Sequence, residues 1–253
     1  MSRRPLLAGN WKMHTTRAEA TTLIEGIAAA AKLAMRDRDV VVAPPFTHLE
    51  TAARAIGKAP IGLAAQNLHW EPKGAFTGEV AAEMLKDVGC THVIIGHSER
   101  RQYFGETDET VSRRLGAALR AGLAPIVCVG ETLGEREAGK TLAVIERQVR
   151  GGLDGLAQDA ARGLTIAYEP VWAIGTGKTA TDEQAEEVHA AIRKLLGAIF
   201  GGDVAAVVRI LYGGSVKPDN VDSLMAKPNV DGALVGGASL DAKGFSRIIA
   251  FQA

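Results

Sequence analysis

Cysteine is scarce in this chain of 253 residues, which contains only Cys90 in the stretch DVGCTHV and Cys128 in the stretch PIVCVG. Two isolated cysteines provide no disulfide framework, and such low usage is typical of a reducing compartment. Cys128 lies inside an apolar run, so we expect it to belong to the core. The sequence therefore argues against a small secreted scaffold held together by disulfides.

Net charge is also absent, because 29 basic residues balance 29 acidic residues. No overall electrostatic field therefore favours nucleic acid, a membrane surface or an acidic partner. An anionic ligand would have to be bound by the local geometry of a site.

Long apolar runs are missing as well, since no run approaches the ~18 residues that a membrane span requires. The first short apolar patch follows Arg3 and Arg4, and Asn10 and Lys12 interrupt it well below the length of a signal peptide. We expect a soluble, cytoplasmic protein.

Eight short apolar runs recur along the chain, and their residues are continuously apolar rather than alternating. This pattern is typical of the strands of a parallel sheet that is buried on both faces. The runs are PLLAGN near Leu6, DVVVAP near Val41, IGLAAQN near Leu63, HVIIGH near Ile94, PIVCVG near Val127, LTIAYE near Ile166, VVRILYGG near Ile210 and GALVGG near Leu234.

The segments between these runs have helical periodicity and helix start signals. In three of them a threonine precedes a glutamate or glutamine by three residues, which predicts a capping box. The pairs are Thr16 with Glu19, Thr47 with Glu50, and Thr181 with Gln184. After the last pair, one helical face is predicted to hold Ala185, Val188, Ile192, Leu195 and Ile199.

Strand and helix thus alternate to the end of the chain. Eight such units in about 250 residues match the size of a closed (β/α)₈ barrel, and we expect one domain over residues 1–253. An open doubly wound sheet is the alternative, because periodicity alone does not show closure. In barrels of this kind the active site lies at the carboxyl ends of the strands. The candidate segments are therefore GNWK, GHSERR, YEPVW, YGGS and GGAS.

The stretch YEPVWAIGTGKTATDEQ, from Tyr168 to Gln184, contains GTGKT and so resembles the end of a phosphate-binding P-loop. A P-loop requires a glycine five positions before Gly177, and the chain has Trp172 there. A Rossmann-type glycine turn is not favoured either, because the predicted strand ends at Glu169 and Pro170, well before the first glycine. We therefore interpret residues 170 to 180 as a long loop of the kind that forms a lid.

Five motifs in this order, GNWKM, GHSERR, YEPVWAIGTG, YGGSV and VGGASL, resemble the triosephosphate isomerase family from Gly9 to Leu240. The resemblance implies a (β/α)₈ barrel with isomerase activity in glycolysis and gluconeogenesis. Members of this family interconvert dihydroxyacetone phosphate and D-glyceraldehyde 3-phosphate through an enediolate. No position that the family uses for catalysis departs from its pattern.

The resemblance also implies catalytic roles for four residues. Glu169 is expected to be the base, and His97 the electrophile that polarises the carbonyl and moves protons between the two oxygens. A helix start directly after His97 would disfavour the imidazolium form and keep the ring neutral. Lys12 is expected to supply positive charge to the oxyanion and the phosphate, and Asn10 a hydrogen-bond donor. Glu99 is expected to order Lys12 or His97.

Phosphate binding requires donors more than net charge. Gly213, Gly214 and Ser215 follow the seventh run, and Gly236 and Gly237 follow the eighth, where barrels commonly hold phosphate on backbone N–H groups. Gly175 in the predicted lid is expected to add one more N–H group. With Asn10 and Lys12, the predicted substrate site therefore comprises Gly175, Ser215, Gly236 and Gly237.

The resemblance further implies a homodimer, formed through the long segment from Gln66 to Glu79. We expect Trp70, Phe76 and Thr77 to be exposed there and to reach toward Lys12 and Asn10 of the partner. The sequence has no cluster of metal ligands, and proton transfer needs none, so we expect neither metal nor cofactor. Two alternatives remain at this stage, a P-loop ATPase or kinase and a barrel that binds sugar phosphates without turning them over.

Overall fold

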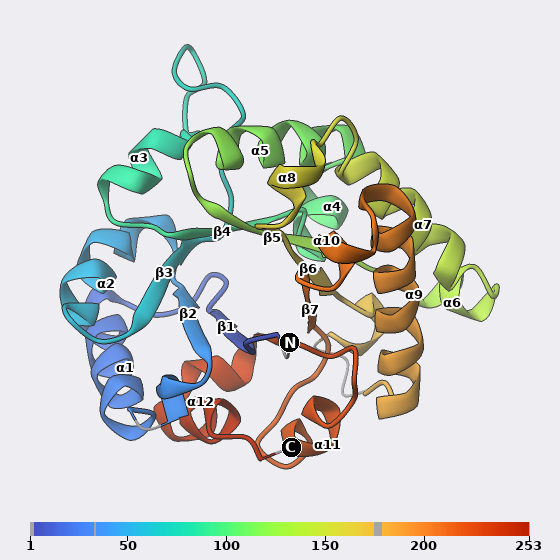
Figure 1. Cartoon of the computed structure of the whole chain (residues 1–253). Helices are drawn as coiled ribbons and strands as arrows, with labels where there is room; N and C mark the ends of the chain where they lie inside the picture. The colour runs from blue at the N-terminus through green and yellow to red at the C-terminus, as the bar shows by residue number, and fades with distance from the viewer. Residues whose placement is uncertain (1–2, 33, 175–178, 253) are drawn as a thin grey trace.

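A computed structural model of the chain describes residues 3–32, 34–174 and 179–252. Within these residues, eight parallel strands close into a barrel in chain order, and β8 pairs with β1 (Figure 1). Closure confirms the predicted (β/α)₈ barrel and contradicts the open sheet. The strands are β1 (Leu6–Asn10), β2 (Asp39–Ala43), β3 (Ile61–Ala65), β4 (His92–Ile95), β5 (Ala124–Val129), β6 (Thr165–Tyr168), β7 (Arg209–Tyr212) and β8 (Gly232–Val235).

Seven strands lie within the predicted apolar runs, and β5 begins at Ala124, one residue before its run. The helices surround the strands as an outer layer (Figure 1). They are α1 (Arg17–Ala30), α2 (Leu49–Ile56), α3 (Ala82–Asp87), α4 (Ser98–Phe104), α5 (Asp108–Arg120), α6 (Leu133–Glu137), α7 (Thr141–Gly152), α8 (Gln158–Ala161), α9 (Asp182–Phe200), α10 (Gly202–Ala205), α11 (Val221–Met225) and α12 (Ala242–Ile249). Short 3₁₀ turns are η1 (Ala34–Arg36), η2 (Phe46–His48), η3 (Val171–Ala173) and η4 (Gly237–Leu240).

Two of the three predicted capping boxes are confirmed, at Thr16 before α1 and at Thr181 before α9. The prediction at Thr47 is wrong. Thr47 lies inside η2, its hydroxyl is 2.9 Å from His48 Nδ1, and α2 begins only at Leu49. A 3₁₀ turn thus takes the place of the expected first turn of α2, and the threonine cannot cap it.

The long helix α9 buries much of the face that was predicted for it. Ala185, Val188 and Ile192 are buried as expected. Leu195 and Ile199 are only partly buried, whereas their neighbours Leu196 and Phe200 are fully packed. After Ile192 the buried stripe is therefore displaced by one residue toward the carboxyl end of the helix.

Strand residues alternate between two apolar cores. Leu6 and Ala8 point into the barrel, whereas Leu7 packs against the surrounding helices. Every strand is thus apolar on both faces, which explains why the sequence runs are continuous. The interior core consists of Leu6, Ala8, Val41, Ala43, Ala64, Ile94, Ile126, Cys128, Ala167, Leu211 and Leu234.

The closure of the barrel depends on a glycine where β8 meets β1. Leu6 pairs with Asp39 of β2 on one side and with Gly232 of β8 on the other. Gly232 has a φ of 146°, and a Cβ added to it would lie 2.0 Å from the Leu6 carbonyl oxygen. Only glycine allows the two backbones to approach this closely.

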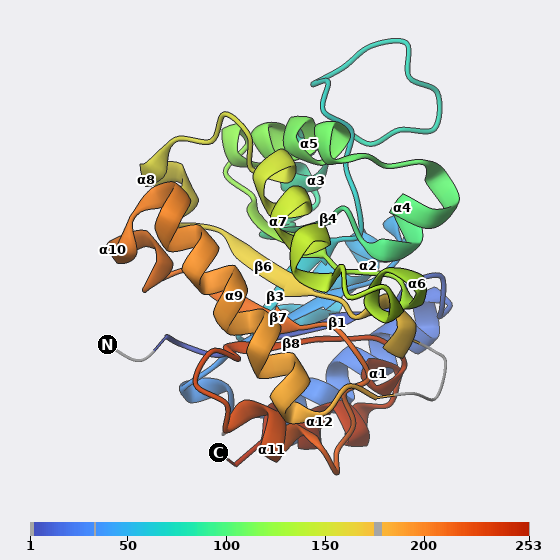
Figure 2. The same ribbon diagram turned by 90° about the vertical axis from the view of Figure 1, so that its right-hand side faces the viewer.

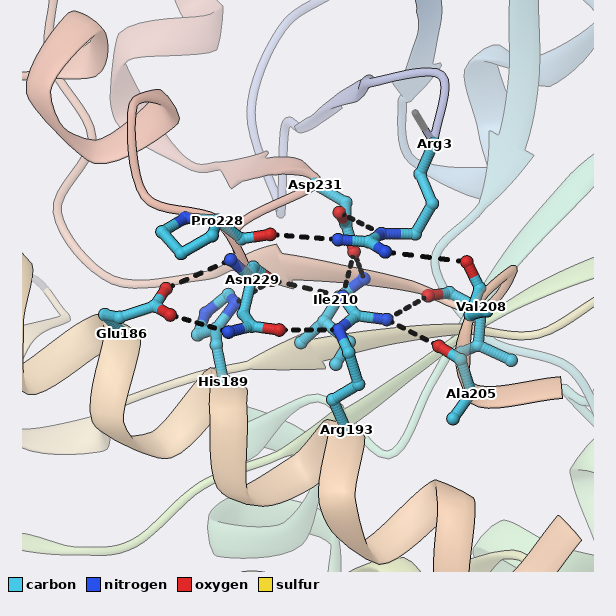
Figure 3. Close-up of polar contacts among 11 residues, drawn as sticks. Arg3, Glu186, His189, Arg193, Ala205, Val208, Ile210, Pro228, Asn229 and Asp231 are labelled. Carbon is cyan, nitrogen blue, oxygen red and sulfur yellow. Dashed lines mark hydrogen bonds and ion pairs between the residues drawn. The ribbon is translucent and has the colours of Figure 1, made fainter. Parts of the chain in front are cut away.

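A polar network joins the amino-terminal segment to the last strand (Figure 3). Asp231, which precedes β8, accepts hydrogen bonds at 2.5 Å from Arg3 Nε and from Arg193 of α9. Its side chain also accepts from the Ile210 N–H of β7 at 2.8 Å. The Asp231 carboxylate is buried, and the two guanidinium groups and the N–H compensate its charge.

The two ends of the barrel hold different parts of the chain. Both termini lie at one end, whereas α4 and α6 lie at the opposite end (Figure 2). The segment between β3 and α3 projects away from the barrel in both views (Figures 1 and 2). In the part of the chain that the structure describes, no helix is long and apolar enough to cross a membrane.

Candidate active site

A cavity of about 450 Å³ opens at the carboxyl ends of the strands. Residues that follow five different strands line it, although they are far apart in the sequence. Among the predicted site residues, those that line the cavity are Asn10, Lys12, His97, Glu169, Ser215, Gly236 and Gly237. Glu99 contacts two of them from the side, and Gly175 lies outside the described residues.

Glu169 and His97 face each other at this cavity. Glu169 Oε1 lies 2.9 Å from His97 Nε2, and Glu169 Oε2 accepts a hydrogen bond of 2.8 Å from the Ser98 N–H. Glu169 directly follows β6, and its N–H donates to the Val129 carbonyl of β5. The backbone of two adjacent strands thus fixes the point from which the carboxylate extends.

Both side chains are buried, and each changes the pKa of the other. Burial raises the pKa of Glu169, but the neighbouring His97, the Ser98 N–H and Lys12 lower it, and the net pKa lies below its ordinary value. Burial lowers the pKa of His97, but the carboxylates of Glu169 and Glu99 raise it above its ordinary value. Glu169 is therefore ionised at neutral pH, as a base must be.

The position of His97 agrees with the sequence prediction. It caps α4, and its Nδ1 accepts a hydrogen bond of 3.2 Å from the Glu99 N–H. An accepting Nδ1 places the ring proton on Nε2, which points to Glu169. The hydrogen bond at Nδ1 agrees with the neutral ring that was expected. The pKa does not, because the contact with Glu169 raises the pKa of His97.

Asn10 ends β1, Lys12 follows it, and both residues line the cavity. The Lys12 ammonium forms an ion pair with Glu99 Oε1, and Glu99 Oε2 is 3.5 Å from His97 Nδ1. Glu99 therefore contacts both residues that it was expected to order. Asn10 Oδ1 accepts from the Lys12 N–H at 3.1 Å, which leaves the Asn10 amide NH₂ as its donor group.

The two glycines after β7 are required by close packing. A Cβ on Gly213 would lie 2.9 Å from Glu169 Cγ, and one on Gly214 would lie 2.3 Å from the Tyr212 hydroxyl. The 3₁₀ turn η4 begins at Gly237, and Gly236 lies beside the Lys12 stem. Gly236, Gly237 and Lys12 thus line the same cavity.

Sequence analysis missed Glu131, a fully buried carboxylate after β5. It accepts hydrogen bonds from the Trp172 indole at 2.9 Å and from the Tyr168 hydroxyl at 3.1 Å, and Arg136 lies 3.2 Å away. Trp172, which had excluded the P-loop, is thus bound to the scaffold at the start of the loop that follows Glu169. No local motif marks Glu131, since two of its partners come from the segment YEPVW, about 40 residues further along the chain.

The segment from Gln66 to Glu79 differs from expectation at one residue. Phe76 and Thr77 are exposed as predicted. The prediction for Trp70 is wrong, because its ring is partly buried and lies 4.1 Å below the Arg113 guanidinium. Trp70 also stacks on His69, so it holds the base of the projecting segment rather than its tip.

Comparison with known proteins finds matches over nearly the whole chain. The family model described as Triosephosphate isomerase matches residues 5–252. The chain is similar to the triosephosphate isomerase of Moorella thermoacetica, with 59% identity over 253 residues covering 99% of both chains. It is also similar to that of Trichlorobacter lovleyi, with 56% identity over 250 residues and 99% of both chains.

Among solved structures, the chain is similar to the crystal structure of triosephosphate isomerase from Bartonella henselae. The TM-score is 0.87 at 44% identity, and the match covers 97% of each chain. The barrel, the cavity at its carboxyl end and these matches agree with one another. The chain belongs to the triosephosphate isomerase family.

Proposed function

We propose that the chain interconverts dihydroxyacetone phosphate and D-glyceraldehyde 3-phosphate by moving one proton between adjacent carbons. The observation that carries this proposal is the placement of Glu169 Oε1 at 2.9 Å from His97 Nε2, at a cavity that Lys12 also lines. A carboxylate base, an N–H donor and a fixed positive charge are the three groups that enediolate formation requires.

Two groups of residues that line the cavity suggest how the substrate binds. The phosphate would lie against the backbone N–H groups of Ser215, Gly236 and Gly237, with Lys12 nearby. The reacting carbons would then lie between Glu169 and His97. Because these two side chains now contact each other, the substrate has to separate them when it enters.

The reaction then proceeds in two stages, formation of the enediolate and its conversion to the product. Glu169 takes a proton from C1 of dihydroxyacetone phosphate while His97 Nε2–H donates to the carbonyl oxygen on C2, and Lys12 and the Asn10 amide stabilise the negative charge that develops. Glu169 next returns the proton to C2, and a proton leaves the C1 hydroxyl by way of His97. The product is the aldehyde, and both side chains recover their initial protonation.

The alternative, a barrel that binds sugar phosphates without turning them over, is less favoured. A binding protein needs donors for the phosphate but has no use for a buried carboxylate with a lowered pKa beside a histidine. In the described part of the chain no group of His, Cys, Asp or Glu is arranged to hold a metal ion. Glu169 and His97 are therefore the groups to which we assign the chemistry.

A coupled assay tests this function directly. The purified chain is given dihydroxyacetone phosphate together with an excess of glyceraldehyde 3-phosphate dehydrogenase and NAD, and NADH formation is followed. We expect turnover without added metal, and much slower turnover for Glu169→Gln measured in parallel. Binding of substrate without turnover by the unmodified chain would contradict the isomerase proposal and favour the binding protein.

We also propose that the chain is a homodimer. Met13, directly after Lys12, is 93% exposed, and Phe76 in the projecting segment is 44% exposed. Tyr103 and Phe104 of α4 are exposed as well. Large apolar side chains exposed around a site favour an interface, and the projecting segment of one copy would reach the Lys12 loop of a second.

We further propose that residues 170 to 180 form a lid over the bound phosphate and that Gly175 contributes an N–H group to it. The support is the position of this segment, because Glu169 stands at its beginning and Thr181 caps α9 at its end.

We also propose that the protein is cytoplasmic. The support is that Cys90 and Cys128 are both free thiols buried in the core.

A further inference from the structure

The backbone of Lys12 has an unusual conformation. Its φ is 52°, in the left-handed region, and among the described residues the only other non-glycine residue with positive φ is Thr15. For an L-residue this region is sterically unfavourable, so the surrounding structure has to hold the residue there. The left-handed conformation determines the direction in which the Lys12 side chain leaves the backbone.

Side chains bind both polar groups of the Lys12 backbone. The N–H donates to Asn10 Oδ1 at 3.1 Å, and the carbonyl accepts from Gln66 Nε2 at 2.8 Å. The same Gln66 nitrogen donates to the Ala43 carbonyl of β2, also at 2.8 Å. Both acceptors are carbonyl oxygens, which can only accept, so the orientation of the Gln66 amide is determined by its partners.

Gln66 follows β3, so its amide joins the ends of three strands. Ala43 closes β2, and its carbonyl also accepts from the Trp11 N–H at 3.1 Å, which belongs to the residue after β1. Gln66 is absent from the lining of the cavity that the described residues form. It can therefore influence the reaction only through the residues that it holds.

We propose that Gln66 is a positioning residue for the isomerase reaction, which keeps Lys12 in its left-handed conformation and thereby directs the ammonium group at the substrate. The proposal rests on the proposed function, in which Lys12 stabilises the oxyanion and the phosphate. If the Lys12 backbone relaxed to negative φ, its Cα–Cβ bond would point elsewhere. The ammonium group would then leave its place beside Glu99 and Gly236.

The test is Gln66→Met, which keeps a side chain of similar length and removes both donors. We expect kcat/KM to fall about 10- to 100-fold, because misplacement of a site residue by about 1 Å has effects of this size. Competitive inhibition by inorganic phosphate should weaken in the same variant. Thr91→Val is the matched control, since Thr91, which precedes β4, donates through Oγ1 to the Leu63 carbonyl of β3 at 3.2 Å. The control should keep kcat/KM within about twofold.

A double-mutant cycle separates positioning from a general structural role. In a Lys12→Met background, Gln66→Met should cause no further loss of the remaining kcat/KM, because the residue that it positions is gone. Circular dichroism and sedimentation at the assay concentration establish that each variant is folded and has the mass of the parent. If Lys12→Met alone kept the activity of the parent, the role of Lys12 in the proposed function would fail, independently of Gln66.

Any of the following results would overturn the proposal. The first is a folded Gln66→Met variant with the kcat/KM and phosphate inhibition of the parent. The second is an equal loss in Thr91→Val, or a further full loss on the Lys12→Met background. The third is failure of both Gln66→Met and Gln66→Glu to fold, which would assign Gln66 to the formation of the barrel instead.

Discussion

Acidification should destabilise this protein through His189, a fully buried residue of α9. His189 Nδ1 lies 3.2 Å from the Asn229 carbonyl oxygen, which can only accept, so Nδ1 carries the proton of a neutral ring. Its Nε2 has no hydrogen-bond partner among the described residues. Burial, together with the nearby Arg193 charge, lowers the pKa of His189 to about 4 despite the Asn229 carbonyl.

The sign and size of the effect follow from this pKa. In the unfolded chain the ring takes up a proton near its ordinary pKa of about 6.5, so between that pH and about 4 the unfolded state binds more protons than the folded state. Stability is therefore lost as the pH falls through this window. The full loss from this one group is about 3 kcal/mol, of which about 2 kcal/mol is lost between pH 7 and pH 5.

Urea unfolding of the parent and of His189→Asn, at one protein concentration and at pH 7 and pH 5, isolates this contribution. Asparagine keeps a donor for the Asn229 carbonyl but does not titrate. The variant should be less stable than the parent at pH 7 because it leaves a cavity, and this difference should shrink by about 2 kcal/mol at pH 5. His92, whose pKa is also lowered to about 4, contributes equally to both proteins and cancels. An unchanged difference at the two pH values would refute the assignment of a neutral, buried His189.

Four further predictions concern the site and the barrel. Glu169→Asp should fold but lose about 10²-fold in kcat, because the shorter side chain withdraws the carboxylate by about 1 Å; a kcat near that of the parent would remove Glu169 as the base. Phe76→Asp or Thr77→Asp should give monomers of much lower activity, and an unchanged sedimentation mass would contradict the proposed interface. Deleting residues 174 to 178 should slow isomerisation and release methylglyoxal and inorganic phosphate, because the uncovered enediolate can expel its phosphate; fast isomerisation without methylglyoxal would make this segment an ordinary loop. Gly232→Ala should lower the free energy of unfolding by about 3 kcal/mol or more, since its Cβ would overlap the Leu6 carbonyl oxygen, and a melting temperature equal to that of the parent would refute this.

The strands could be predicted from the sequence because each is apolar on both faces. Leu6 points into the barrel and Leu7 toward the helices, so consecutive residues of the run are apolar because each packs into one of the two cores. The pairing of β1 with β8 could not be derived from periodicity, because it depends on contacts between residues more than 200 positions apart, such as Leu6 with Gly232. The number of strand and helix units and the length of the chain favoured closure, and the family resemblance also implied it.

The site residues that directly follow strands could be predicted from the sequence. Properties that depend on tertiary contacts could not. His97 could be placed before a helix, but its contact with Glu169, which raises its pKa, depends on how β4 and β6 are positioned across the barrel. Glu131 and Gln66 carry no motif, since their partners lie in distant segments of the chain. Thr47 matched the pattern of a helix cap, but it lies inside a 3₁₀ turn, and α2 begins only after that turn.

The pairing of the first strand with the last has a consequence for biosynthesis. One edge of β1 has no partner until residues 232–235 have left the ribosome, and the Arg3 side chain likewise waits for Asp231. Throughout elongation the nascent chain therefore presents two unpaired strand edges, that of β1 and that of the strand made most recently. Open edges of this kind recruit other chains, so the risk of aggregation is greatest just before the eighth unit emerges and ends when it docks.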